Sequence, residues 1–210
     1  MLLNHITHRV VVTGKPDLIA AFKAKHIVAE KPGGKPCFDF TTINPMPDIL
    51  RGSERPSDAH YGLLILDRGE LSDDLFSPKT LDEMLTDPWV VAEGITTTDA
   101  LKEHLLKLDP ECVARAERAI ELHRQTGHFN SDKWRTQHWG TTWHCYFFNI
   151  VEDSPGRFEF MFVTPWNVPV PIFEKLAAEY PGLRFAIVAF PADATYAFTG
   201  ATRNGAFVGW

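Results

Sequence analysis

Two runs of alternating side chains, joined by a short turn, constrain the fold of this chain more than any other feature. Residues 141–151 (TTWHCYFFNIV) and 157–164 (RFEFMFVT) follow the two-residue period of β-strands. Between them lies the stretch Glu152 to Gly156, which contains Ser154-Pro155-Gly156, residue types that favour a hairpin turn. The sequence therefore predicts a β-hairpin and, with it, antiparallel strand pairing.

Further strand and helix patterns lie on both sides of this hairpin. Short β-branched or aromatic runs bounded by Gly or Pro predict strands, and apolar residues spaced three or four apart predict helices. The predicted strands are residues 5–14, 37–43, 183–190 and 195–200, and the two predicted helices outside the middle of the chain begin near Pro16 and Val170.

The middle of the chain, residues 77–140, reads as a helical block. Ser77-Pro78, Asp87-Pro88 and Asp109-Pro110 each pair a helix-capping residue with proline at the first helical position. The clearest helix follows Asp109, and Gly127 is placed to cap its C-terminal end. We expect this block to be inserted in a domain made by the flanking strands.

Without the block and the last strand, we read the order of elements as βαββαβ. This is the ferredoxin-like order, an antiparallel sheet with two helices on one face. The predicted fold class is therefore α+β. We predict a single domain over residues 1–210, with the helical insertion 77–140 between the second and third strands.

The strands carry apolar side chains on both faces. Trp143, Cys145 and Phe147 alternate with Tyr146 and Phe148, and residues 185–190 (FAIVAF) are apolar in both registers. Each buried aromatic side chain is worth roughly 1.5 to 3 kcal/mol, so we expect the second face to be covered. The helical block or a homodimer partner could supply this cover. Either one would exclude an RNA reader that uses an open sheet.

Composition narrows the class of protein. The chain has 210 residues, of which 44% are hydrophobic, and a formal net charge of −6, which disfavours nonspecific binding to nucleic acid or to anionic membranes. The three cysteines are far apart, as is typical of free thiols in a reducing compartment. No apolar run approaches the ~20 residues of a transmembrane helix, and the first residues read as a strand rather than a signal peptide, so we expect a cytoplasmic protein.

Several segments carry a resemblance to a known family. The block WGTTW at 139–143 and the block TPWNVP at 164–169 are fairly specific as a pair, and NHITHRVVVTG and FDFTTINPMP add to them. On these residues the chain resembles the YubB-type ferredoxin-like family, small proteins encoded by plasmids, phages and genomic islands. The resemblance covers roughly half of the chain, at both ends and around the predicted insertion.

The resemblance implies a ferredoxin-like fold and a protein of mobile genetic elements, but no activity and no cofactor. The positions that match the family pattern are Asn4, His5, Phe38, Asp39, Pro45, Met46, Pro47, Trp139, Gly140, Thr141, Trp143, Tyr146, Thr164, Trp166, Pro169 and Gly200.

A metal site is the first chemical hypothesis to weigh, because His138, His144 and Cys145 lie close together in the sequence. Zinc favours tetrahedral sets of His and Cys ligands. However, His144 and Cys145 are neighbours on a predicted strand, so their side chains point to opposite faces. Both also stand where the chain departs from the family pattern. We therefore predict no metal site.

A second hypothesis is catalytic. His5 lies on the first predicted strand and Asp39 on the second, where the carboxylate could orient the imidazole as a general base. A small hydrolase or nuclease could be built on this pair. The alternative is that both residues make structural hydrogen bonds at strand ends.

A third hypothesis is a binding surface. Trp139, Trp143, Tyr146 and Trp166, with nearby prolines, could line an aromatic cleft for a protein or small-molecule partner. The alternative is that they pack in the core. We expect a non-enzymatic binding or accessory module, with the enzyme as the alternative. A nucleic-acid binder is a weaker possibility that would need a basic stripe on one face, such as Arg115, Arg118, Arg124 and Lys133.

Overall fold

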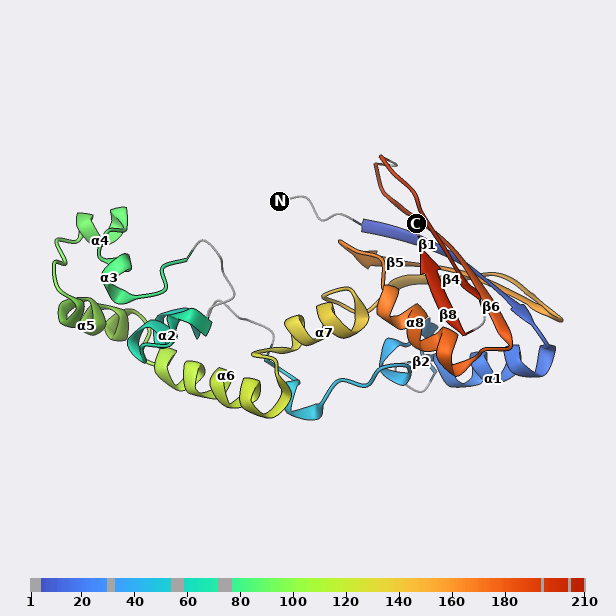
Figure 1. Cartoon of the computed structure of the whole chain (residues 1–210), viewed down its shortest axis with the longest axis horizontal. Coiled ribbons are helices and arrows are strands. Elements are labelled where there is room, and N and C mark those ends of the chain that lie inside the picture. The colour runs from blue at the N-terminus through green and yellow to red at the C-terminus, as the bar shows by residue number, and fades with distance from the viewer. Residues whose placement is uncertain are drawn as a thin grey trace. The chain divides into compact units, whose positions relative to one another are not determined.

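A six-stranded antiparallel sheet is the largest element of the computed structural model (Figure 1). The structure describes residues 5–29, 33–53, 59–71, 77–193, 195–203 and 205–209. The strand order is β4-β5-β1-β6-β7-β8, and every neighbouring pair is antiparallel, which makes the protein α+β as predicted. The strands are β1 (His5–Gly14), β4 (Tyr146–Ser154), β5 (Arg157–Pro165), β6 (Leu183–Pro191), β7 (Phe198–Arg203) and β8 (Ala206–Gly209).

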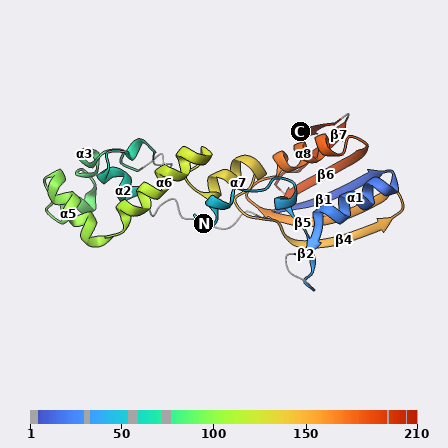
Figure 2. The ribbon, with the colours of Figure 1, turned by 90° about the horizontal axis from the view of Figure 1, so that it is seen from below.

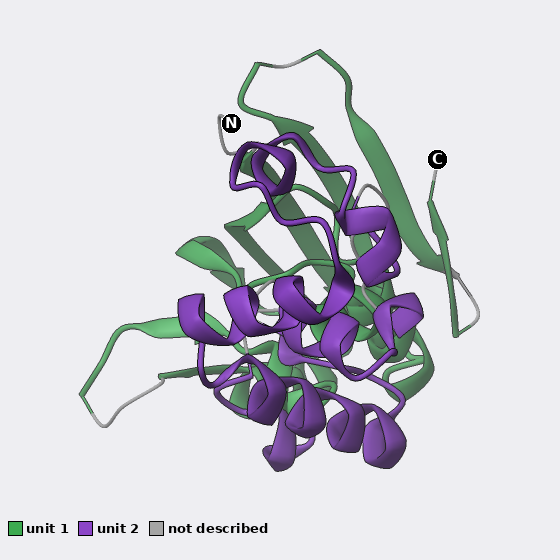
Figure 3. Ribbon diagram, turned by 90° about the vertical axis from the view of Figure 1, so that its left-hand side faces the viewer, with its two compact units in different colours: residues 1–46, 133–210 green, residues 47–132 purple. Residues whose placement is uncertain are grey.

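The chain divides into two compact units, coloured separately in Figure 3. Unit 1 contains residues 1–46 and 133–210 and holds the sheet, whereas unit 2 contains residues 47–132. The division therefore starts well before the predicted insertion at residue 77. It ends inside helix α7 (Ser131–Trp139), which the sequence analysis placed wholly within the helical block.

One face of the three strands β5, β1 and β6 is buried. On the central strand β1, Val10 lies opposite Phe160 on β5 and Ile187 on β6, and all three side chains are buried. The residues that alternate with them, such as Arg9 and Val188, lie on the other face, and both are exposed. We call this second side the open face. It carries the odd-numbered residues of β1 and β5 and the even-numbered residues of β6.

Helices α1 (Pro16–His26) and α8 (Val170–Glu179) pack on the buried face. The Phe22 ring of α1 lies 5.3 Å from the Phe185 ring on β6, and the Phe173 ring of α8 lies 5.7 Å from the Phe207 ring on β8, measured between centroids. In Figure 2, α1 lies beside the strands β6, β1, β5 and β4. Phenylalanine dominates this core; the fully buried rings are Phe22, Phe38, Phe40, Phe158, Phe160, Phe162, Phe173 and Phe185.

The predicted second strand, residues 37–43, does not belong to the sheet. Only β3 (Pro36–Phe38) is extended, and it pairs with β2 (Ile27–Ala29) in a separate two-stranded ribbon. The chain then enters a 3-10 helix, η1 (Phe40–Thr42), because the Asp39 carboxylate accepts hydrogen bonds from Thr41. The strand that follows β1 and α1 into the sheet is β4. The predicted place of the insertion, between the second and third strands of the sheet, is therefore wrong.

Within a single chain, β4 is not buried on both faces, and cover by a homodimer partner stays a prediction. This edge strand leaves Phe147, Ile150 and Val151 exposed. Its pairing with β5 shifts register twice, between Tyr146 and Asn149 and again between Ile150 and Glu152. Such bulges turn side chains away from the regular alternation that a sequence pattern assumes.

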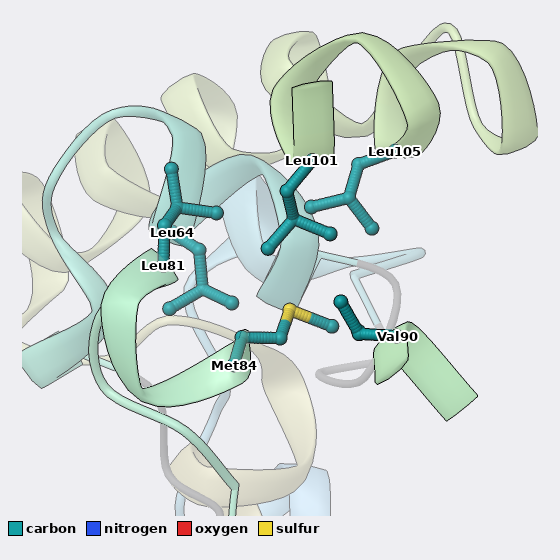
Figure 4. Close-up of a cluster of buried hydrophobic side chains, with 6 residues drawn as sticks. All are labelled: Leu64, Leu81, Met84, Val90, Leu101 and Leu105. Carbon is teal, nitrogen blue, oxygen red and sulfur yellow. The ribbon is translucent and has the colours of Figure 1, made fainter. Parts of the chain in front are cut away.

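Unit 2 is helical and has its own core. Six buried apolar side chains point toward one another in Figure 4: Leu64, Leu81, Met84, Val90, Leu101 and Leu105. The helices among the described residues of this unit are η2 (Asp48–Leu50), α2 (His60–Ile65), η4 (Gly69–Leu71), α3 (Leu81–Met84), α4 (Pro88–Ala92), α5 (Thr98–Leu108) and α6 (Cys112–Thr126). As predicted, Gly127 caps α6 in a left-handed conformation. None of the described helices has the length and apolar character needed to cross a bilayer.

Candidate functional site

Two residues of the predicted site meet at one end of the open face. His5, at the start of β1, and Tyr146, at the start of β4, share a hydrogen bond between the imidazole Nδ1 and the phenol oxygen. Burial raises the pKa of Tyr146, so near neutral pH the phenol remains protonated. It can then donate to Nδ1, which places the ring proton of a neutral His5 on Nε2.

Backbone strain surrounds this pair. Among the described residues, three that are not glycine have a positive φ: Asp67, Phe147 at 53° and Trp166 at 67°. Phe147 directly follows Tyr146, and Trp166 directly follows Pro165, the cross-strand partner of His5. For a bulky side chain this backbone region costs about 1 to 3 kcal/mol, and residues held there often lie at functional sites.

The strain at Trp166 comes from a tight turn at the end of β5. The amide of Asn167 donates to the carbonyl oxygen of Pro165 across 2.8 Å, so Trp166 is the central residue of a three-residue γ-turn with positive φ, a rare and strained form. The hydroxyls of Thr164 and Thr141 hold the turn, through Asn167 O at 2.7 Å and Pro165 O at 3.0 Å.

Two of the aromatic side chains near this point remain in solvent. Phe147 is 79% exposed and Trp143 is 47% exposed. Tyr146 and Trp166 are half-buried. We refer to Trp143, Tyr146, Phe147 and Trp166 as the aromatic surface. Of its members, the sequence analysis proposed all but Phe147.

Trp139, the remaining residue of the predicted aromatic cleft, is a core residue. It is only 3% exposed, and its indole nitrogen donates to the backbone carbonyl of Asn44 across 2.8 Å. Its ring lies against Phe40 and Trp134. Including Trp139 in a binding surface is therefore wrong. Trp139 is the last residue of α7, and the chain changes direction at Gly140. The sequence alone does not show that this change of direction leaves the Trp139 ring in the core.

The predicted catalytic residues have separate partners. Tyr146 is the hydrogen-bond partner of His5, whereas the carboxylate of Asp39 lies 3.0 Å from Nε2 of His144 and accepts from Thr41. Asp39 caps η1 rather than standing on a sheet strand. This geometry supports the alternative, in which His5 and Asp39 each make structural hydrogen bonds.

Asp39 is held as a carboxylate. Burial alone would raise its pKa, but the hydrogen bonds from His144 and Thr41 outweigh burial and lower the pKa to about 2. Because the folded pKa lies below the ordinary value of 3.8, these interactions stabilise the fold above about pH 4. That stability is lost as the pH falls toward 2.

Asp39→Asn is therefore expected to lower the free energy of unfolding by about 1 kcal/mol at pH 7, because an amide replaces a charge-assisted acceptor. The difference from the wild type should disappear near pH 2. Urea unfolding at both pH values measures it. Asp48→Asn is the control, because Asp48 caps no helix and its ion pair with Arg51 is highly exposed. Equal losses in the two variants would contradict this role for Asp39.

The residues of the metal hypothesis serve other purposes. The thiol of Cys145 is buried and donates to the carbonyl oxygen of Phe38 across 2.9 Å, and burial raises its pKa, so it stays protonated. His144 places Nε2 3.0 Å from the Asp39 carboxylate and stacks its ring on Phe40, with 5.0 Å between the centroids. Within the described ranges, no group of three or more His, Cys, Asp or Glu side chains is arranged to hold a metal ion.

Two residues of the possible basic stripe, Arg115 and Arg124, form ion pairs with carboxylates. Arg115 pairs with Asp109, and Arg124 makes two hydrogen bonds to Glu121 at 2.6 and 2.8 Å. These arginines of α6 are therefore engaged with carboxylates of their own unit. This arrangement gives little support to nucleic-acid binding along α6.

Two buried histidines, His8 and His26, were not among the residues predicted from the sequence. His8 lies on the buried side of β1, stacked on Phe162 with a centroid distance of 4.5 Å. His26 ends α1 and joins Thr42 at 2.7 Å to Tyr180 at 3.1 Å. The signal for His8 was present, because it shares the two-residue register of Ile6 and Val10. His26 has no comparable signal, since its partners come from η1 and from the end of α8.

Comparison with known proteins assigns the chain to no family. No family model matches it, and no curated protein matches it. One similar solved structure is that of the protein api92 from Yersinia pseudotuberculosis, assigned to the family DUF1281. The two chains are 10% identical, with a TM-score of 0.48, over 100% of this chain and 98% of the other. Asn4 of the sequence pattern lies outside the described residues.

Proposed function

We propose that this chain is a non-enzymatic binding module that recognises a protein partner through its aromatic surface. The proposal depends on the exposure and the backbone conformation of Phe147. Its ring is 79% exposed, and its backbone is held at a positive φ. A strained residue whose side chain is in water gains no burial energy to offset the strain. Contact with a partner would supply that energy.

The position of Phe147 supports recognition of an extended peptide. It lies on β4, which is an edge strand of the sheet as described. An edge strand leaves one flank uncovered, so an extended peptide that crosses the open face can reach the side chains of β4 there. Trp143 and Phe147 would contact side chains of such a peptide, since exposed aromatic side chains are common anchors at interfaces.

The proposal includes a ferredoxin-like arrangement for unit 1. The order β4-β5-β1-β6, with α1 after β1 and α8 before β6, supports it. The resemblance to the YubB-type family adds the expectation of a protein encoded by mobile genetic elements. The alternative, an enzyme that uses His5 and Asp39, gains no support from the structure, because the two side chains have different partners.

Phe147→Gly is expected to separate stability from binding. Glycine adopts the left-handed region without steric cost, so the free energy of unfolding should stay unchanged or rise by up to about 1 kcal/mol. Binding should weaken at least about tenfold, the effect of losing an anchor worth 1.4 kcal/mol. The measurements are thermal unfolding and the affinity for peptides selected on the wild-type chain from a phage-displayed random library.

Asp67→Gly is the matched control, because it makes the same relief of a positive φ on unit 2. It should leave binding unchanged. The proposal fails if no peptide is enriched, or if the selected peptides bind Phe147→Gly as tightly as the wild type.

A further inference from the structure

Beside the aromatic surface, the open face carries an ion-pair network built on a buried carboxylate. Glu159 of β5 is only 2% exposed although it lies on the open face. One of its oxygens accepts from Nε of Arg9 and the other from Nη2 of Arg157, both across 2.6 Å. The hydrogen bond from Arg9 contributes most to lowering the pKa of Glu159, which is thus ionised at neutral pH.

The two arginines differ in what they have left to donate. Arg157 uses Nη2 for Glu159 and Nε for Glu152, at 2.6 and 2.7 Å. Within the described ranges, Arg9 makes a hydrogen bond only through Nε, and its side chain is 55% exposed. Its Nη1 and Nη2 groups therefore remain available. A guanidinium held through one nitrogen, with two others free, can bind a planar carboxylate through paired hydrogen bonds.

The charge of the open face differs from that of the whole chain. On β1, β4, β5 and β6 this face carries three arginines, Arg9, Arg157 and Arg184, against two glutamates, Glu152 and Glu159. Three positive and two negative charges leave +1 on the face, whereas the whole chain has a formal charge of −6. The chain as a whole is acidic but this face is not, and Arg9 supplies donors for an anionic group there.

We propose that Arg9 binds a carboxylate of an acidic peptide segment in the partner, as that segment crosses the open face toward the aromatic surface. The proposal rests on the proposed function and adds the chemistry of the partner. A single oriented arginine fits one carboxylate. A nucleic acid would need several unpaired cations to follow its phosphates, and aromatic side chains on the central strands to stack its bases. On β1 and β5 the open face has Thr7, Val11 and Met161 instead, and β6 adds one aromatic side chain, Phe190.

The spacing defines the peptide further. Arg9 and His5 lie four residues apart on β1, which is about 14 Å along a strand. An extended peptide would bridge this distance with about four residues. We therefore expect an Asp or Glu in the selected peptides, separated by about that number of residues from an apolar or aromatic side chain that contacts the aromatic surface.

The test uses the full chain and fluorescein-labelled synthetic copies of the peptides selected for the wild type. Arg9→Gln is expected to weaken their binding at least about tenfold. Changing the acidic residue of the peptide to its amide should weaken wild-type binding equally and have little further effect on Arg9→Gln. Arg157→Gln is the matched control, because each variant leaves Glu159 with one arginine. Arg157→Gln should bind the peptides as tightly as the wild type does. Thermal unfolding of both variants then shows whether they are folded.

The outcomes separate the two proposals. If the peptides depend on Phe147 but bind Arg9→Gln and Arg157→Gln alike, the role of Arg9 is wrong and the proposed function stands. Peptides without an acidic residue would overturn the acidic class. If instead a single-stranded oligonucleotide binds in an Arg9-dependent way and no peptide does, the partner chemistry proposed here is wrong.

Discussion

His8→Leu is expected to make the free energy of unfolding of this protein much less sensitive to mild acid. His8 is fully buried between β5 and β6, and neither ring nitrogen has a hydrogen-bond partner among the described residues. Burial lowers the pKa of His8 from 6.5 to about 3. The carbonyl groups of Phe162 and Ile6 oppose this effect in part, but neither makes a hydrogen bond of ordinary geometry.

The sign of the effect follows from where the proton binds. Between pH 6.5 and 3 the unfolded chain protonates this imidazole and the folded chain does not. The stability is therefore complete above pH 6.5 and falls by about 1.4 kcal/mol for each pH unit below it, from this residue alone. His26, whose pKa burial also lowers, adds a slope of the same sign, so His8→Leu should reduce the slope without abolishing it.

Urea unfolding at several values between pH 5 and 7.5 measures this slope, in a range where carboxylates are not yet protonated. At pH 7 the variant should be at least as stable as the wild type, because an unpaired buried imidazole costs about 1 to 3 kcal/mol. His123→Leu makes the same substitution at an exposed position of α6 and should keep the wild-type slope. An unchanged slope in His8→Leu would show that His8 is not buried in the neutral form.

Gly140→Ala is expected to destabilise unit 1 by about 2 to 4 kcal/mol. Gly140 follows α7 at a φ of 82°, and a Cβ atom there would lie 2.9 Å from Pro171 Cδ and 3.0 Å from the carbonyl oxygen of Val168. Two costs therefore add: the left-handed backbone at a residue with a side chain, and overpacking against the start of α8. The same segment leads to the aromatic surface, so peptide binding should weaken as well.

Gly127→Ala separates these two costs. Gly127 ends α6 at a φ of 76°, but a Cβ atom there would have no neighbour within 4 Å. Its loss should be about 1 kcal/mol, from the backbone alone. The difference between the two variants in urea unfolding then measures the packing cost at Gly140. Equal losses would mean that the contact between α7 and the start of α8 is not tight.

Much of the fold was predictable because it depends on local patterns. The hairpin of β4 and β5, the helix after Pro16 and the cap at Gly127 all follow from side-chain period and from turn and cap residues. The same patterns misplaced residues 37–43. The two apolar residues at the start of that run, Cys37 and Phe38, do predict a strand, but the carboxylate of Asp39 then favours a 3-10 turn.

The candidate site was only half predictable for a similar reason. His5, Trp143, Tyr146 and Trp166 could be named from residue type, yet their exposure could not. Bulges in β4 put Phe147 in solvent, while Trp139 turned into the core. A sequence pattern assumes regular alternation, and a bulge changes which side a residue faces without leaving a clear mark in composition.

By itself, the sequence determined the α+β class, most of the strands and helices, and the aromatic and histidine residues from which a site could be made. These are consequences of local period and of turn and cap chemistry, which act between near neighbours in the chain. Only the tertiary structure decided which of those residues meet. It joined His5 to Tyr146 and Asp39 to His144, and it left the Nη groups of Arg9 without a hydrogen-bond partner among the described residues, beside a buried Glu159. Such pairings depend on strand register and on close packing between distant segments, and no short stretch of sequence contains that information.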